Sequence, residues 1–244
     1  MKQKEKEVAI GTCPYCLKEE KTLSSKEHVI PRGWFNHEEY PIVKPIIIYT
    51  CEDCNNSKSE DDSWMRAWLT SVAADKSKVA ENIFRKKVVP SFTKGKFLPH
   101  FRELQNNVRL SDCLPSGLHL PHPVPQISVS DSSWSRIKTN INRIAKGLLY
   151  EKFKYILPDT HSVETFFAND PELELSEPLK KIFLAIDPNS WNKDNHPVFI
   201  YGIANDENRD MFICITAFYD RVAFISMVGP TEWIEDARKS ASFN

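Results

Sequence analysis

The chain of 244 residues lacks several features that mark whole classes of protein. No apolar run approaches the roughly 20 residues that a membrane-spanning helix needs, and the opening MKQKEKEVAI is charged where a secretory signal is apolar. We find no internal repeat and no extended low-complexity tract. With 41% hydrophobic and 11% aromatic residues, the chain can bury a core. We therefore expect a soluble cytoplasmic protein that does not associate with membranes.

The chain also lacks a net charge that would indicate its partner. A formal charge of -1 gives no overall attraction to nucleic acid, although it averages over regions of different sign. Residues 75–109 contain nine basic residues and only three acidic ones. The basic residues are Lys76, Lys78, Arg85, Lys86, Lys87, Lys94, Lys96, Arg102 and Arg109. This segment is typical of phosphate-backbone contact, and the alternative is a helix face that charge keeps solvated.

Six cysteines are present, and four of them form two C-x2-C pairs, Cys13/Cys16 and Cys51/Cys54. Two such pairs supply four thiolates at the spacing of a structural tetrahedral zinc site. The alternatives are a redox C-x-x-C motif or four buried apolar side chains. Cys113 and Cys214 stand alone and are expected to be core residues.

Between and after the cysteine pairs lie side chains with complementary chemistry. Glu27 and His28 are adjacent in EHVIP, and Asn55 directly follows the last cysteine of the pairs. Carboxylate and amide oxygens are ligands that Mg2+ accepts, whereas a neutral imidazole can take a proton from water near pH 7. If the four cysteines bind one zinc ion, residues 27, 28 and 55 are drawn together from separate segments.

The motifs CPYC, EHVIP and CEDCNNSK, in this order, resemble those of the HNH endonucleases, the ββα-metal-finger nucleases, in the variant with a four-cysteine zinc site. The resemblance covers about the first quarter of the chain. It implies DNA phosphodiester hydrolysis with His28 as general base, and Mg2+ or Mn2+ held by Glu27 and Asn55. It also implies that Cys13, Cys16, Cys51 and Cys54 hold a structural zinc ion.

Two positions depart from the commonest family pattern. Ile46 stands where many members have an asparagine that orients the histidine, so a backbone carbonyl or another side chain must do this here. Asn55 stands where the last metal ligand is often histidine, and Asp61 or Asp62 is a candidate for a further ligand. Lys58 is interpreted either as a phosphate contact or as a solvated helix residue.

We expect an α+β fold in four parts: an HNH ββα-metal finger over residues 1–70, a basic helical connector over 71–110, a linker over 111–132, and an α+β domain over 133–244. Apolar residues at helical spacing predict a helix from about residue 132 to the residue before Pro158. The stretch from His196 to Pro230 predicts three antiparallel strands.

Three functions are compatible with these sequence features. The first is a metal-dependent DNA endonuclease, with RNA not excluded, of the kind that serves restriction or phage defence. The second is a zinc-knuckle module that binds nucleic acid without catalysis. The third is an interaction subunit whose last domain forms a homodimer or docks a partner protein, because the uncharged VAFISMVG is poorly protected if it forms a sheet edge.

Overall fold

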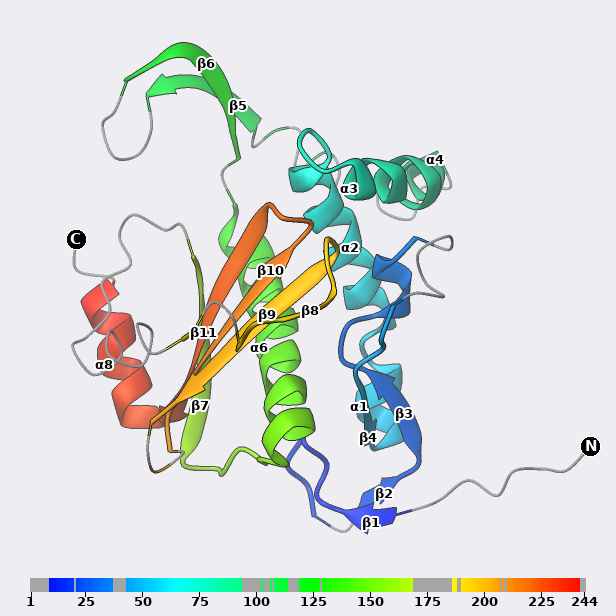
Figure 1. The fold of residues 1–244 in the computed structure, drawn as a ribbon, viewed down its shortest axis with the longest axis vertical. Coiled ribbons are helices and arrows are strands. Elements are labelled where there is room, and N and C mark those ends of the chain that lie inside the picture. The colour runs from blue at the N-terminus through cyan, green and yellow to red at the C-terminus, as the bar shows by residue number, and fades with distance from the viewer. Residues whose placement is uncertain are drawn as a thin grey trace, which may run out of the picture.

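The computed structural model describes residues 9–19, 21–36, 43–93, 102, 106, 108–113, 119–127, 129–168, 186–187, 190–206, 208 and 210–241. It is an α+β structure (Figure 1). The N-terminal part begins with two short antiparallel strand pairs. The pairs are β1 (Ala9–Gly11) with β2 (Lys21–Leu23), and β3 (Ser25–His28) with β4 (Ile47–Thr50). A short 3-10 turn, η1 (Arg32–Trp34), follows β3.

Helices follow β4 without a long connection. They are α1 (Glu52–Asn56), α2 (Ser59–Ala73), α3 (Lys78–Ile83), the π-helical turn η3 (Phe84–Val88) and α4 (Val89–Thr93). Ser77 caps α3, since its side chain accepts a hydrogen bond from the Ala80 amide. In the predicted basic connector, residues 71–73 and 78–93 are helical, and residues 74–77 form a turn between the helices.

A β-hairpin occupies much of the segment for which the sequence predicts a linker. Strand β5 (Val108–Cys113) pairs antiparallel with β6 (His119–Ile127). The hairpin projects away from the rest of the molecule (Figure 1). The prolines of this segment favoured an irregular connection, but a two-stranded ribbon has two open edges and tolerates prolines whose amide position faces outward.

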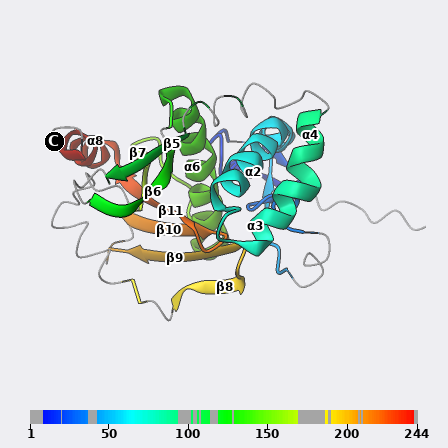
Figure 2. The same cartoon turned by 90° about the horizontal axis from the view of Figure 1, so that it is seen from above.

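The C-terminal part is a five-stranded antiparallel sheet crossed by a long helix. The strand order is β7-β11-β10-β9-β8, and most of it is visible from above in Figure 2. The strands are β7 (His161–Phe167), β8 (Asn192–Asn195), β9 (Phe199–Asn205), β10 (Phe212–Phe218) and β11 (Val222–Pro230). The helix α6 (Asp131–Phe153) begins at the Ser130 cap, and its end is marked by the left-handed conformation of Lys154.

Residues of strand β10 pack into apolar cores on both faces of the sheet. Phe212, Cys214 and Phe218 face the main core beside α6, while Ile213 and Ile215 face a second, smaller core. Ile234 of α8 (Thr231–Ala241) belongs to that second core. Figure 1 shows α8 on the side of the sheet away from the N-terminal part. The predicted three-stranded meander is therefore the centre of a larger sheet.

The interior position of β11 removes the reason for expecting association through its edge. Residues Phe224–Pro230 pair with β7, and Phe212–Phe218 pair with the other side of β11. The uncharged strand is thus hydrogen-bonded on both sides. No homodimer follows from this strand, and dimerisation remains an untested prediction.

One apolar core spans the predicted boundary between the N-terminal and C-terminal parts. Trp34, Trp64 and Trp68 belong to the same cluster as α6 and the sheet residues Phe218 and Tyr219. Trp34 packs edge-on against Phe218 with ring centroids 5.4 Å apart, and Tyr219 donates a hydrogen bond of 2.8 Å to the Trp34 carbonyl. Among the described helices, none is long and apolar enough to cross a membrane.

Candidate functional site

The two cysteine pairs meet in space as the sequence predicts. The sulfur atoms of Cys13, Cys16, Cys51 and Cys54 all lie within 4.8 Å of one another, and none of the four is in a disulfide. The Cys16 and Cys51 sulfurs are 3.9 Å apart. A tetrahedral site with Zn–S bonds of about 2.3 Å separates its sulfurs by about 3.8 Å. The cluster can therefore hold a zinc ion.

Local backbone geometry favours ionisation of one of these thiols, that of Cys13, whereas burial raises the pKa of Cys51 and Cys54. The turn after Cys13 is closed by a hydrogen bond of 2.9 Å from the Leu17 amide to the Cys13 carbonyl. Burial acts to raise the pKa of Cys13, but hydrogen bonds from the backbone of Cys16, Cys51 and Tyr15 outweigh it and lower the pKa to about 7. A thiol that ionises near neutral pH is a ready zinc ligand, because the metal binds the thiolate.

Helix α6 supplies a contact to this cluster that the sequence did not reveal. Arg143 donates a hydrogen bond to the Cys54 carbonyl, and its guanidinium lies over the Tyr15 ring at 4.6 Å. Gly147, one turn further along α6, allows the close approach, since an added Cβ would lie 2.9 Å from both the Tyr15 hydroxyl and Val29 Cγ1. Nothing in the local sequence near residue 143 indicates this pairing across 89 positions.

A pocket of about 420 Å³ lies where β3, η1, α1 and α2 converge. Its lining includes all three predicted catalytic residues, Glu27, His28 and Asn55. The rest of the lining is Lys26, Pro31, Arg32, Gly33, Trp34, Lys58, Ser59, Asp62, Ser63 and Arg66. The strand pair β3–β4 and the short helix α1 thus bring Asn55 close to Glu27 and His28, which precede it by 28 and 27 positions.

Glu27 is the most deeply buried charged group of the pocket, with 1% of its surface exposed. Its Oε1 atom pairs with the Lys58 ammonium, while its Oε2 atom is buried and has no hydrogen-bond partner among the described residues. Burial raises the pKa of the Glu27 carboxyl, and the Lys58 charge opposes that shift. Lys58 is itself buried, so it is not a solvated helix residue, and its role as a phosphate contact stays a prediction.

His28 ends strand β3 and is partly exposed in the same pocket, which matches the expected position at a strand end. Burial lowers the pKa of its imidazole, and the positive charges of Arg32 and Lys58 lower it further. The ring is therefore neutral at pH 7. No described residue forms a hydrogen bond with the His28 ring. At position 46, where the family pattern has the orienting asparagine, the Ile46 carbonyl accepts a hydrogen bond of 3.0 Å from the Val29 amide.

Asn55 is held by its amide nitrogen, which donates to the Ser25 hydroxyl at 3.1 Å. The amide oxygen accepts no hydrogen bond from the described residues. Of the two aspartates considered as further ligands, Asp62 lines the pocket, and its Oδ2 atom is 3.4 Å from the Lys58 ammonium. Asp61 instead forms an ion pair of 2.6 Å with Arg136 of α6 and is absent from the lining.

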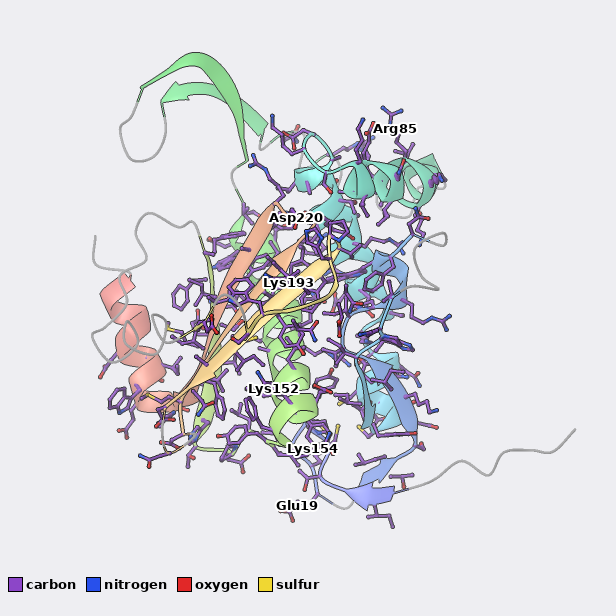
Figure 3. The ribbon with its side chains drawn as sticks, in the orientation of Figure 1. Glu19, Arg85, Lys152, Lys154, Lys193 and Asp220 are labelled. Atoms are coloured by element: carbon purple, nitrogen blue, oxygen red, sulfur yellow. The ribbon has the colours of Figure 1, made fainter. Side chains whose placement is uncertain are left out.

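The residues predicted to bind nucleic acid occupy different environments. Arg85 and Lys86 are exposed, and Figure 3 shows Arg85 projecting outward from the helical segment. Arg85 also pairs with Glu81 at 2.8 Å. Lys87 is half-buried and donates hydrogen bonds to the carbonyls of Gly33 and Phe35 beside the pocket. Lys94 and Lys96 lie outside the described residues.

The pocket lining carries oxygen atoms of the chemical type that hard divalent cations bind. A buried carboxylate oxygen without a hydrogen bond and an amide oxygen without a described donor line one pocket, together with the Asp62 carboxylate. Such oxygens are the ligands that Mg2+ and Mn2+ prefer. The Lys58 ammonium already neutralises Glu27, so a cation entering here must displace that ion pair.

No protein-family model, curated protein or solved structure matches this chain. Its function is therefore inferred from the chemistry of its own residues.

Proposed function

We propose that this protein is a metal-dependent endonuclease of the HNH type that hydrolyses DNA phosphodiester bonds. The observation that carries the proposal is the pocket shared by Glu27, His28 and Asn55, built against a cluster of four cysteines. A general base and two hard oxygen ligands are the minimum set for activating water beside a phosphate. The order of β3, β4 and α1 around this pocket supports the ββα assignment.

Each residue has a distinct role in this proposal. The neutral His28 imidazole accepts the proton of the attacking water. Glu27 and Asn55 would hold Mg2+ or Mn2+, and Asp62 is placed to assist them. A bound divalent ion supplies Lewis-acid stabilisation of the negative charge that develops on the phosphate and the leaving oxygen. The cysteines hold zinc, which keeps β1–β4 and α1 in position.

The path proposed for DNA runs from the pocket to the basic helical segment. Lys87 of η3 contacts the carbonyl of Gly33, which lines the pocket, so the two regions adjoin. Arg85 and Lys86 lie exposed on the same turn. Exposed cations beside a reactive pocket are suited to phosphate-backbone contact. RNA remains the alternative substrate.

A cleavage assay on supercoiled plasmid tests the proposal directly. Purified protein should nick or linearise plasmid in Mg2+ or Mn2+ and should be inactive after EDTA treatment and gel filtration into metal-free buffer. His28→Ala should lower the cleavage rate by at least 100-fold while DNA binding and zinc content stay at the wild-type level. His196→Ala is the matched control, because His196 is exposed and pairs only with Asp220 at 3.0 Å. Equal cleavage by the His28→Ala and wild-type proteins would contradict the proposed mechanism.

A zinc-knuckle module that binds nucleic acid without catalysis is the second candidate. The ion pair between Lys58 and Glu27 favours it, because the buried Glu27 carboxylate is charge-compensated without any divalent ion. This module would bind DNA with the same affinity in Mg2+ and in EDTA and would cleave nothing. Calorimetric titration with Mn2+ separates the candidates, since the nuclease should bind Mn2+ and Glu27→Ala should not.

A further inference from the structure

Arg66 is a cation of the pocket that lacks a carboxylate partner. It lies on α2, lines the pocket and is half-buried. The one hydrogen bond of its side chain among the described residues is a long contact of 3.5 Å from Nη1 to the Gly33 carbonyl, and its Nε atom is buried without a partner among them. Burial lowers the pKa of this guanidinium, with Tyr219 and Asp62 opposing the shift. A buried guanidinium with so little compensation is costly.

Among the described residues, Arg66 forms no ion pair with the acidic groups of the pocket, because Lys58 engages both, and Asp62 acts on its charge only at longer range. The Lys58 ammonium pairs with Glu27 and lies 3.4 Å from Asp62 Oδ2. The lining thus contains four basic residues, Lys26, Arg32, Lys58 and Arg66, and two acidic ones, Glu27 and Asp62. Among the described lining residues, basic side chains therefore exceed acidic ones by two. An excess of this sign attracts an anion.

Gly33 provides the space in which the Arg66 guanidinium lies. A Cβ added to Gly33 would be only 2.7 Å from Arg66 Nη1. Any other residue at position 33 would therefore displace the end of the arginine side chain. Because Gly33 has no side chain, the Arg66 guanidinium can lie at the wall of the pocket, which both residues line.

We propose that Arg66, lodged against Gly33, binds the non-bridging oxygens of a phosphate in this pocket. The inference rests on the proposed function and deepens it, because it names the residue that holds the phosphate group in the pocket that His28 also lines. The planar guanidinium presents parallel donors that match two oxygens of a phosphodiester. Lys58 is committed to the carboxylates, so it does not serve this role.

Binding of inorganic phosphate and of a thymidine dinucleotide to the full chain, measured by calorimetry in EDTA-free buffer without divalent metal, tests the proposal separately from catalysis. Arg66→Gln should weaken binding of both at least tenfold, and Arg66→Lys should recover part of the loss. In the wild-type protein, the Arg66 Nε–H signal in a 15N correlation spectrum should shift as phosphate is added. Arg221→Gln is the matched control, because Arg221 is exposed at the β10–β11 turn and is not among the residues that line the pocket.

Gly33→Ala provides a second test that leaves Arg66 in place. It should weaken phosphate binding by displacing the guanidinium, whereas Gly11→Ala, whose new Cβ meets Leu23 at an ordinary 3.4 Å, should not. If the wild-type protein does not bind phosphate or the dinucleotide, or if Arg66→Gln binds them as tightly, the inference is wrong even where DNA is cleaved. If binding depends on Arg66 and no variant or wild-type protein cleaves DNA, the inference stands and the nuclease proposal fails.

Discussion

The ion pair between Lys58 and Glu27 determines how the pocket behaves without a divalent metal. Glu27 is 1% exposed, and such a carboxylate is tolerated only when a cation or a metal compensates it. Lys58 fills that role, and it also contacts the His28 carbonyl at 3.2 Å. The same lysine therefore stabilises the metal-free pocket and opposes metal entry.

Replacing Lys58 with methionine should make folding depend on the divalent metal. The variant leaves Glu27 as an uncompensated buried charge, which should cost about 3 to 5 kcal/mol of stability without metal. Mg2+ or Mn2+ should then restore more stability to Lys58→Met than to the wild-type protein, since the ion no longer competes with the ammonium. Thermal denaturation with and without Mg2+ measures this difference.

Lys138→Met is the matched control for that measurement. Lys138 also pairs with a glutamate, Glu164, but at the interface of α6 and β7 and away from the pocket. Loss of the ion pair between Lys138 and Glu164 should lower the melting temperature by the same amount in Mg2+ and in EDTA. A metal response of Lys58→Met no larger than that of Lys138→Met would remove Glu27 from the proposed ligand set.

At the scale of single residues, local motifs identified part of the candidate site. The paired cysteines, Glu27, His28 and Asn55 stand out because their chemistry is encoded in short spacings. Arg66 and Arg143 do not stand out, and the pairing of Lys58 with Glu27 was not predicted, because these roles depend on partners brought close by the fold. A lysine or arginine within a helical pattern looks solvated until its neighbours in space are known.

At the scale of elements, the N-terminal strand pairs and α1 depend on the cysteine cluster. Apart from Ile48 of β4, which belongs to the main core, their buried apolar residues are Cys13, Leu23 and Cys51, with Tyr15, Cys16 and Cys54 partly buried against them. Strands of three and four residues cannot hold this arrangement without a cross-link or a metal.

We expect one zinc ion per chain, which mass spectrometry under native conditions or elemental analysis measures. Replacing Cys51 and Cys54 together with serine should abolish zinc binding and lower the melting temperature, because half of the thiolates are lost. Cys214→Ala is the control, since Cys214 is buried in the sheet and outside the cluster. It should lower stability and keep the zinc, and full zinc content in the double variant would exclude this cysteine cluster as the zinc site.

Two buried threonines of the central sheet should respond in opposite directions to the same substitution. The Thr216 hydroxyl is buried without a hydrogen-bond partner among the described residues. The Thr165 hydroxyl is bonded to Asn142 at 2.6 Å and to Ser226 at 2.8 Å. Thr216→Val should stabilise the protein by about 1 kcal/mol, and Thr165→Val should destabilise it by about 1 to 3 kcal/mol. Urea denaturation measures both, and destabilisation by Thr216→Val would show that its hydroxyl is satisfied in solution.

The elements themselves were predictable to different degrees. The helical period from Trp134 to Phe153 and the alternation from Phe199 to Gly229 correctly predict α6 and strands β9 to β11. The hairpin β5–β6 was not predicted, because prolines weaken any strand pattern. Strands β7 and β8 were also missed, since an edge strand carries polar residues and is defined by its pairing with a neighbour.

At the scale of the whole molecule, the N-terminal and C-terminal parts share one core and should unfold together. The predicted division at residues 111–132 does not separate two cores, because Trp34 and Trp64 pack in the same cluster as Phe218 and Phe224. We expect release of zinc, followed with a chromogenic chelator, to coincide with loss of the sheet signal in circular dichroism as denaturant rises.

Tyr219→Phe tests how much the hydrogen bond between Tyr219 and Trp34 contributes to the stability of the protein. Tyr219 is fully buried, and its hydroxyl donates to the Trp34 carbonyl across 185 positions of the chain. Removing the hydroxyl leaves a buried carbonyl unpaired and should cost about 1 to 3 kcal/mol. Tyr201→Phe is the control, since the Tyr201 hydroxyl donates to no described residue. Equal stability of the two variants would show that the hydrogen bond contributes little.

Because Trp34 and Tyr219 lie 185 positions apart in the sequence, their contact can form only late in the synthesis of the chain. During synthesis at about 5 to 20 residues per second, residues 185 positions apart emerge roughly 10 to 40 s apart. For that interval Trp34 lacks the sheet residues that cover it, and the wall of the pocket that it forms is incomplete. The nascent cysteine pairs can capture zinc early, but the pocket beside them is finished only when the last strands have been made.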